Sequence, residues 1–137
     1  MSKEKDIIKL DSDGNMDFGD FTLTQKTKHD GFEYNGDIYK VKTWREITKL
    51  ERNGLFLYES VPGTTVISFK EDEEGISFEV IGEEDAQITL GLADETEYEV
   101  SVNGSDAGIL KSSLGGKLDI SVEFTSDQPV PITVKRV

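Results

Sequence analysis

The chain has 137 residues, a formal net charge of −13 and no cysteine, and 35% of its residues are hydrophobic. This length is typical of one domain with its own core, and the lack of cysteine excludes disulfide bonds, thiolate metal ligands and thiol nucleophiles. The acidic charge disfavours binding to nucleic acid or to a membrane surface, and no apolar run approaches the ~20 residues that a membrane-spanning helix needs.

The charge is divided unevenly along the chain. Residues 1–54 contain 10 Lys or Arg and 11 Asp or Glu, whereas residues 55–137 contain 5 and 17. The first part is therefore nearly neutral, and the second carries almost all of the negative charge. A basic region beside an acidic body favours pairing between copies of the chain by charge.

Residues 1–6 contain no apolar segment and no small-residue cleavage site. A secretory signal requires both. We therefore expect no signal and a cytoplasmic location.

The first 61 residues predict three β-hairpins. Residues 7–18 form the first around an Asp- and Asn-rich turn, residues 32–41 the second around Asn35-Gly36, and residues 46–61 the third around Asn53-Gly54. Asn-Gly favours a type I′ turn because both residues adopt a positive φ at low cost. A two-residue turn in the third hairpin pairs Arg52 with Leu55, sets Leu50 opposite Leu57 and sets Lys49 opposite Tyr58.

Two segments are less regular. Residues 25–31 are polar and include the sole histidine, His29, for which we expect an exposed position in a loop. Apolar residues recur every third position between Val41 and Leu50, as in a helix, but β-branched residues and the absence of a helix cap favour strand.

From residue 65 onward apolar and polar residues alternate with a period of two. This alternation predicts antiparallel strands with one buried face, and turn residues recur about every ten positions. The sequence thus predicts an all-β protein in which N-terminal hairpins (residues 1–63) pack on a C-terminal antiparallel sandwich of immunoglobulin-like or jelly-roll type (residues 64–137). Pro62-Gly63 is the predicted seam of what we expect to be one compact unit.

Two stretches carry a family resemblance. Residues 98–104, Tyr-Glu-Val-Ser-Val-Asn-Gly, and residues 115–124, Gly-Gly-Lys-Leu-Asp-Ile-Ser-Val-Glu-Phe, resemble the final strands of immunoglobulin-like or fibronectin-III-like modules in bacterial carbohydrate-active proteins. Residues 39–50 and 58–63 resemble small acidic bacterial proteins labelled endosialidase. That resemblance implies cleavage of sialic-acid polymers.

No catalytic residue of a sialidase can be carried over to this chain. The repeated Ser-x-Asp-x-Gly-x-Thr-Trp boxes of those enzymes are missing, and Ser12-Asp13-Gly14 lacks their spacing. Sialidases share an arginine triad. Three arginines occur here, Arg45 and Arg52 on one predicted hairpin and Arg136 near the end of the sequence. The sequence leaves enzymatic activity open but favours a non-enzymatic role.

Oxygen ligands occur at alternate positions in Asp11, Asp13 and Asn15, as in a calcium loop. Met16 and Thr22 stand where an EF-hand has its glycine and its bidentate glutamate, and an Asp-rich turn accounts for the same residues. Acidic loops at residues 71–74 and 94–97 are expected at one end of the sandwich, where they either hold a cation or keep the protein soluble. We expect no cofactor.

Aromatic and basic residues alternate between positions 34 and 58. We single out Tyr39, Lys40, Lys42, Trp44, Arg45, Lys49, Arg52 and Tyr58 as candidate binding residues, because Trp, Tyr and Arg are enriched at interface hot spots. The alternative is that the aromatics belong to the core and the lysine stems cover them. The sequence predicts a protein-interaction or self-assembly module, a homo-oligomer or a complex with a protein partner. A carbohydrate-binding or glycan-processing accessory protein is the alternative.

Overall fold

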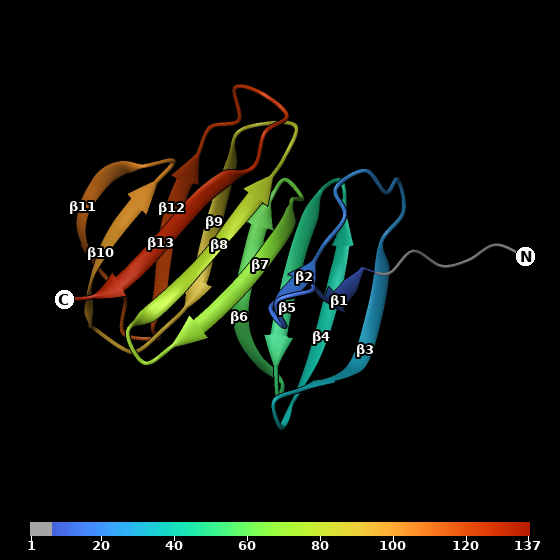
Figure 1. Ribbon diagram of the computed structural model, residues 1–137, viewed down its shortest axis with the longest axis horizontal. Coiled ribbons are helices and arrows are strands. Elements are labelled where there is room, and N and C mark those ends of the chain that lie inside the picture. Colours follow the sequence, from blue (N-terminus) through green and yellow to red (C-terminus); the bar gives the residue numbers. More distant parts are fainter. Residues whose placement is uncertain (1–6) are drawn as a thin grey trace, which may run out of the picture.

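The computed structural model describes residues 7–137, which form thirteen strands in two antiparallel sheets packed face to face. Figure 1 shows one sheet in front and the other behind it. The all-β prediction is confirmed, and no helix in the described residues is long and apolar enough to cross a membrane. Residues 1–6, on which the expectation about a secretory signal depends, lie outside the described part.

The front sheet has seven strands and the rear sheet has six. In spatial order the seven-stranded sheet contains β1 (Ile8–Leu10), β2 (Met16–Phe18), β7 (Thr65–Asp72), β8 (Gly75–Ile81), β13 (Val130–Arg136), β10 (Glu97–Val102) and β11 (Ser105–Lys111). The six-stranded sheet contains β12 (Lys117–Val122), β9 (Ala86–Gly91), β6 (Leu55–Val61), β5 (Ile47–Arg52), β4 (Asp37–Trp44) and β3 (Thr27–Tyr34).

Strands from both sides of Pro62 share each sheet. In the seven-stranded sheet β2 pairs with β7, and in the six-stranded sheet β6 pairs with β9. The N-terminal hairpins are therefore not a layer packed on a separate sandwich, because they supply part of both of its sheets. The reason is that two long-range pairings, invisible to local periodicity, place the early strands beside late ones.

The predicted hairpins are present, and their turns have the expected backbone. Asn35, Gly36, Asn53 and Gly54 all have positive φ, between 51° and 83°. Arg52 pairs with Leu55 as predicted, but Leu50 faces Tyr58 and Lys49 faces Glu59. A β-bulge after Leu50 shifts the register by one residue, so the predicted pairs beyond the turn were wrong.

The polar stretch before the second hairpin is a strand and not a loop. His29 is exposed, as expected, but it lies in β3 and pairs with Val41. β3 is the edge of the six-stranded sheet, and an edge strand tolerates polar residues on both faces because one of its sides meets water.

The core lies between the sheets and is rich in aromatic rings. Phe18 and Phe78 pack edge-to-face on Tyr58, with ring centroids 5.1 Å and 5.8 Å away. Leu50 and Tyr58 are both fully buried. Phe18 and Phe78 come from the seven-stranded sheet, and Leu50 and Tyr58 come from the six-stranded one. The core therefore joins strands from both halves of the sequence.

A cluster of buried hydroxyl groups ties three strands of the six-stranded sheet to the segments that cross to the other sheet. The Thr48 hydroxyl donates to the Thr64 carbonyl oxygen (2.8 Å) and accepts from the Thr64 N–H (3.0 Å). The Thr48 hydroxyl also lies 2.7 Å from the Thr43 hydroxyl. Because the Thr48 proton is already donated to Thr64, the Thr43 hydroxyl is the donor in this bond. Tyr58 and Ser60 each lie 2.7 Å from the Thr64 hydroxyl.

Replacing Leu50 by Asp tests the core position of β5. We expect Leu50→Asp to lower the free energy of unfolding by about 4 kcal/mol or more, because it places a carboxylate in a site without water. Ile38→Asp makes the same kind of exchange at a side chain that is 49% exposed, and should change stability by less than about 1 kcal/mol. Urea unfolding measures both, and equal losses in the two variants would contradict the assignment.

Because Tyr58 is buried, we expect the free energy of unfolding to fall at alkaline pH. Burial raises the pKa of Tyr58, although its hydrogen bonds to Thr64 and Ser60 partly oppose the shift. The native protein therefore holds this proton while the unfolded chain releases it above about pH 10, so stability falls as the pH rises through that value. Tyr58→Phe should cost about 1 kcal/mol at pH 7 and make the decline between about pH 9 and 11 shallower. Urea unfolding measures the free energy of unfolding of both proteins across this pH range. If it declines equally steeply with pH in the wild type and in Tyr58→Phe, the role of Tyr58 is refuted.

Candidate functional site

The outer face of the six-stranded sheet collects most of the predicted basic residues. On β4 the side chains at positions 39, 41 and 43 are buried, so the alternation places Lys40, Lys42 and Trp44 on the outer face. On β5 the buried Thr48 and Leu50 place Lys49 on the same face. This face is on the far side of the molecule in Figure 1.

Three lysines on this face lie directly opposite one another across adjacent strands. Lys28 of β3 pairs with Lys42 of β4, and Lys42 pairs with Lys49 of β5. We call these three residues the lysine row. Neighbouring strands are about 4.8 Å apart, so the stems run side by side, and like charges directly opposite are unfavourable by roughly 0.2–1 kcal/mol per pair.

The positive charge of the row has little ion pairing within residues 7–137. Among residues 7–137 only Lys49 of the row has a carboxylate within ion-pair distance, Glu51 at 3.7 Å on its own strand. The pKa of Lys42 is lowered, first by partial desolvation and then by the positive charges of Lys26, Lys49, Lys28 and Lys40. The face thus holds a local excess of cations on a protein with a net charge of −13.

The lysine row continues across the sheet into acidic residues. Lys49 lies opposite Glu59 of β6, which pairs with Thr89 of β9, which in turn pairs with Asp119 of β12. The Thr89 hydroxyl donates to the Asp119 carboxylate (2.7 Å). Along this row the charge is therefore positive on β3, β4 and β5 and negative on β6 and β12.

A parallel row of apolar and amide side chains runs beside the charged one. Trp44 lies opposite Ile47, and Val61, which is 53% exposed, pairs with Gln87. The Trp44 indole Nε1 is the one buried side-chain donor in residues 7–137 without a hydrogen-bond partner. Such an unsatisfied group is uncommon in a native structure and costs about 1–3 kcal/mol.

Two predicted binding residues belong to the core. Tyr58 is fully buried and Tyr39 is 5% exposed, so neither presents a ring to a partner. The sequence left this alternative open. Burial also raises the pKa of Tyr39, an effect that the neighbouring Arg52 guanidinium partly opposes.

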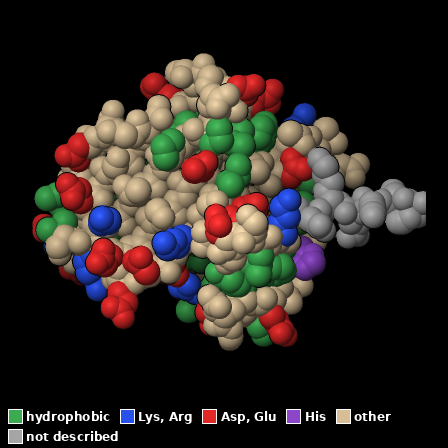
Figure 2. Space-filling model, viewed as in Figure 1, with side chains coloured by type: hydrophobic (Ala, Val, Ile, Leu, Met, Phe, Trp, Pro, Cys, Tyr) green, Lys and Arg blue, Asp and Glu red, His purple; other side chains and the backbone are tan. Residues whose placement is uncertain are grey.

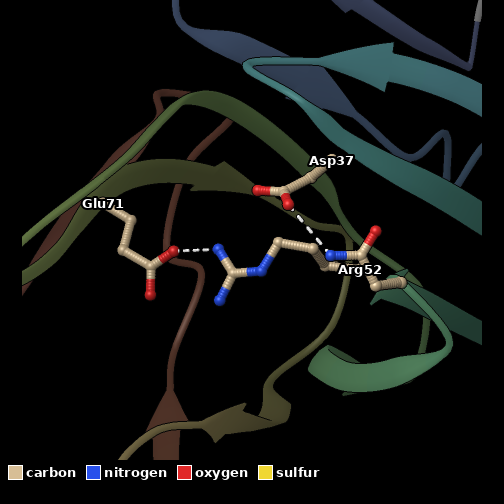
Figure 3. Close-up of polar contacts among 4 residues, drawn as sticks. Asp37, Arg52 and Glu71 are labelled. Carbon is tan, nitrogen blue, oxygen red and sulfur yellow. Dashed lines mark hydrogen bonds and ion pairs between the residues drawn. The ribbon is translucent and has the colours of Figure 1, made fainter.

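Two predicted arginines lie away from the outer face, at opposite ends of β5. Arg45 is exposed in the turn before this strand and lines a hollow of about 580 Å³ with Pro62 and Glu84. Arg52 ends the strand and forms an ion pair with Glu71 of β7, which raises the pKa of the guanidinium (Figure 3). The eight predicted residues therefore do not form a single site.

Two of the three arginines line one hollow. Arg52 and Arg136 border a space of about 290 Å³ together with the acidic loop at residues 71–74. Arg45 lies at the other end, so the three arginines do not converge into a carboxylate clamp. The Arg52–Glu71 ion pair links β5 of one sheet to β7 of the other, which gives it a structural role.

The expected convergence of loops at one end of the sandwich is present, but no cation site is found there. Within residues 7–137 no group of three or more His, Cys, Asp or Glu is arranged to hold a metal ion. The acidic loop at residues 71–74 borders the hollow that contains Arg52 and Arg136, which supply countercharge.

The first-hairpin loop has a structural explanation. One carboxylate oxygen of Asp11 accepts from the N–H groups of Asp13 (2.9 Å) and Asn15 (3.0 Å), and the other accepts from the Ser68 hydroxyl (2.9 Å). The backbone hydrogen bond from Asn15 is the largest cause that lowers the pKa of Asp11. One oxygen is therefore used within the turn, as in an Asx-turn, and the other holds the turn to β7, so the two are not directed at a common ligand.

Several residues that complete the outer face were not predicted from the sequence: Lys28, Ile47, Glu59, Val61, Gln87 and Asp119. For those on β6, β9 and β12, the alternation with apolar neighbours was visible in the sequence. Which strands stand beside one another was not, and only that order places Glu59 and Asp119 in line with the lysines.

Comparison of the chain with protein-family models, with curated proteins and with solved structures finds no match. The candidate site is therefore assigned from the geometry of this chain alone.

Removing the central charge of the lysine row should make the protein more stable. Lys42 stands between two lysines, so we expect Lys42→Gln to raise the free energy of unfolding by about 0.5 kcal/mol at low salt, and less in about 1 M NaCl. Lys40→Gln is the matched control, because Lys40 is on the same strand and face but lies opposite Glu51. Urea unfolding should show no gain for Lys40→Gln, and a gain shared by both variants would contradict repulsion within the row.

Proposed function

We propose that the chain is a non-enzymatic interaction module that binds an acidic protein surface through the outer face of its six-stranded sheet. The observation that carries the proposal is the register of Lys28, Lys42 and Lys49, three cations side by side with one carboxylate partner among the described residues. An arrangement that is unfavourable in the free protein becomes favourable when an anionic surface lies against it.

The contrast with the rest of the molecule supports this choice of face. Figure 2 shows the outer face of the seven-stranded sheet, where basic and acidic side chains are intermixed. There Lys135 lies opposite Glu99, and Lys111 lies opposite Glu97. These two lysines are therefore paired with acidic residues across strands, whereas those of the lysine row face one another.

A neutral-sugar site has less support. Sugar rings usually stack on an exposed aromatic side chain. All twelve aromatic side chains lie within the described residues, and each is buried or half-buried. An acidic glycan, such as the sialic-acid polymers that the endosialidase resemblance implies, remains the second candidate, because its carboxylates suit the same lysines.

Binding of poly-L-glutamate tests the proposal. Trp44 is the sole tryptophan and lies on the same face as the lysine row, so its fluorescence should report binding. We expect saturable binding that weakens as salt rises from about 0.05 to 0.5 M, because the contacts are charge pairs. The triple variant Lys28→Gln/Lys42→Gln/Lys49→Gln should lose at least about tenfold in affinity.

The matched control is Lys9→Gln/Lys111→Gln/Lys135→Gln, which removes the same charge from exposed lysines of the other sheet. An equal loss in both triple variants would show that net charge, and not the lysine row, governs binding, and would refute the proposal. Sialic-acid polymer and neutral dextran, tested in the same way, distinguish the acidic-glycan candidate from the acidic-protein one. Tight binding of the sialic-acid polymer without binding of poly-L-glutamate would favour the glycan.

A further inference from the structure

The charged row on the six-stranded sheet has an order that is complementary to itself. From β3 to β12 its side chains are Lys28, Lys42, Lys49, Glu59, Thr89 and Asp119. The first half is positive and the second half carries two carboxylates. The middle of the row falls between β5 and β6, the third and fourth of the six strands.

A two-fold axis parallel to the strands, placed between β5 and β6, reverses the strand order of a second copy that lies face to face with the first. Lys49 then faces the second copy's Glu59, Lys28 faces its Asp119, and Lys42 faces its Thr89, which lies between those carboxylates. A two-fold interface repeats each contact, so every pair occurs twice. Two sheets packed face to face keep their strands within about 30° of each other, which this axis satisfies.

The neighbouring apolar row fits the same operation. Ile47 on β5 comes opposite the second copy's Val61 on β6, and Trp44 on β4 comes opposite its Gln87 on β9. Val61 is 53% exposed in the single chain, so the pairing would remove apolar surface from water beside the charge pairs. An apolar strip flanked by complementary charges is the usual composition of a protein interface.

We infer that the acidic partner of this face is a second copy of the chain, in a two-fold dimer that joins the outer faces of two six-stranded sheets. This inference rests on the proposed function, because it names the partner of the same surface. The face is about 29 Å by about 20 Å, or roughly 600 Å² of flat area, from strand spacing and rise. That size is at the low end of specific interfaces, so the dimer should be reversible.

Charge exchange at the central pair gives the sharpest test. Lys49→Glu alone would set two carboxylates against each other at both symmetric contacts, and Glu59→Lys alone would set two ammonium groups against each other there. Neither variant should dimerise. Mixed in equal amounts, the two should form a heterodimer, because each copy then supplies the sign that the other lacks. Sedimentation velocity and native mass spectrometry, at up to about 1 mM protein and about 0.15 M salt, measure the species.

We expect the wild type to dimerise, each single variant to be monomeric, and the mixed pair to associate at least about tenfold more tightly than either variant with itself. The double variant Lys49→Glu/Glu59→Lys should dimerise again. The control pair Lys111→Glu and Glu97→Lys makes the same exchange at opposed residues of the seven-stranded sheet and should leave dimerisation unchanged.

A wild type that stays monomeric, a mixture that forms no heterodimer, or single variants that still dimerise would each overturn the inference. Failure of the dimer is separable from failure of the proposed function. A monomer whose lysine row still binds poly-L-glutamate would retain the interaction surface and lose only the second copy as its partner.

Discussion

The hydroxyl of Thr48 is the point on which the arrangement of the two sheets depends. It bonds both backbone groups of Thr64, in the segment where the chain leaves the six-stranded sheet for the seven-stranded one. Thr43, bonded to Thr48, accepts from the backbone N–H of Asp20 where the chain makes the reverse crossing (2.9 Å). Gly19 is required there, since a Cβ would lie 2.6 Å from the Thr64 carbonyl oxygen. These two crossings, the first two along the chain, therefore meet at one buried cluster.

The outer face of the six-stranded sheet follows from this buried cluster. Because Thr43 and Thr48 must point inward, the residues next to them on β4 and β5, Lys42 and Lys49, must point outward. The same register that satisfies the buried hydroxyls brings the lysines side by side. A repulsive row on the surface is tolerated because slipping the strands by one residue would bury lysines and expose the hydroxyl cluster.

The molecule separates two uses of charge. Acidic side chains at the loop ends meet arginines, as in the Arg52–Glu71 ion pair that joins the sheets. On the outer face of the six-stranded sheet the cations are instead grouped and left with little countercharge among residues 7–137. Charge that is neutralised within the chain supports the fold, whereas charge that is not neutralised is available to a partner. This difference distinguishes the lysine row from Arg52, one of the three arginines that the resemblance to sialidases singled out.

The sequence by itself determined the all-β class and the hairpins at the Asn-Gly turns, because turn chemistry and alternation are local properties of the chain. It also placed Lys40, Lys42 and Trp44 on one strand face. It did not determine the β-bulge after Leu50, the burial of Tyr39 and Tyr58, or the alignment of Lys28 with Glu59 and Asp119. Those features depend on which distant strands pair and on how two sheets fill the space between them, and only the tertiary structure fixes both.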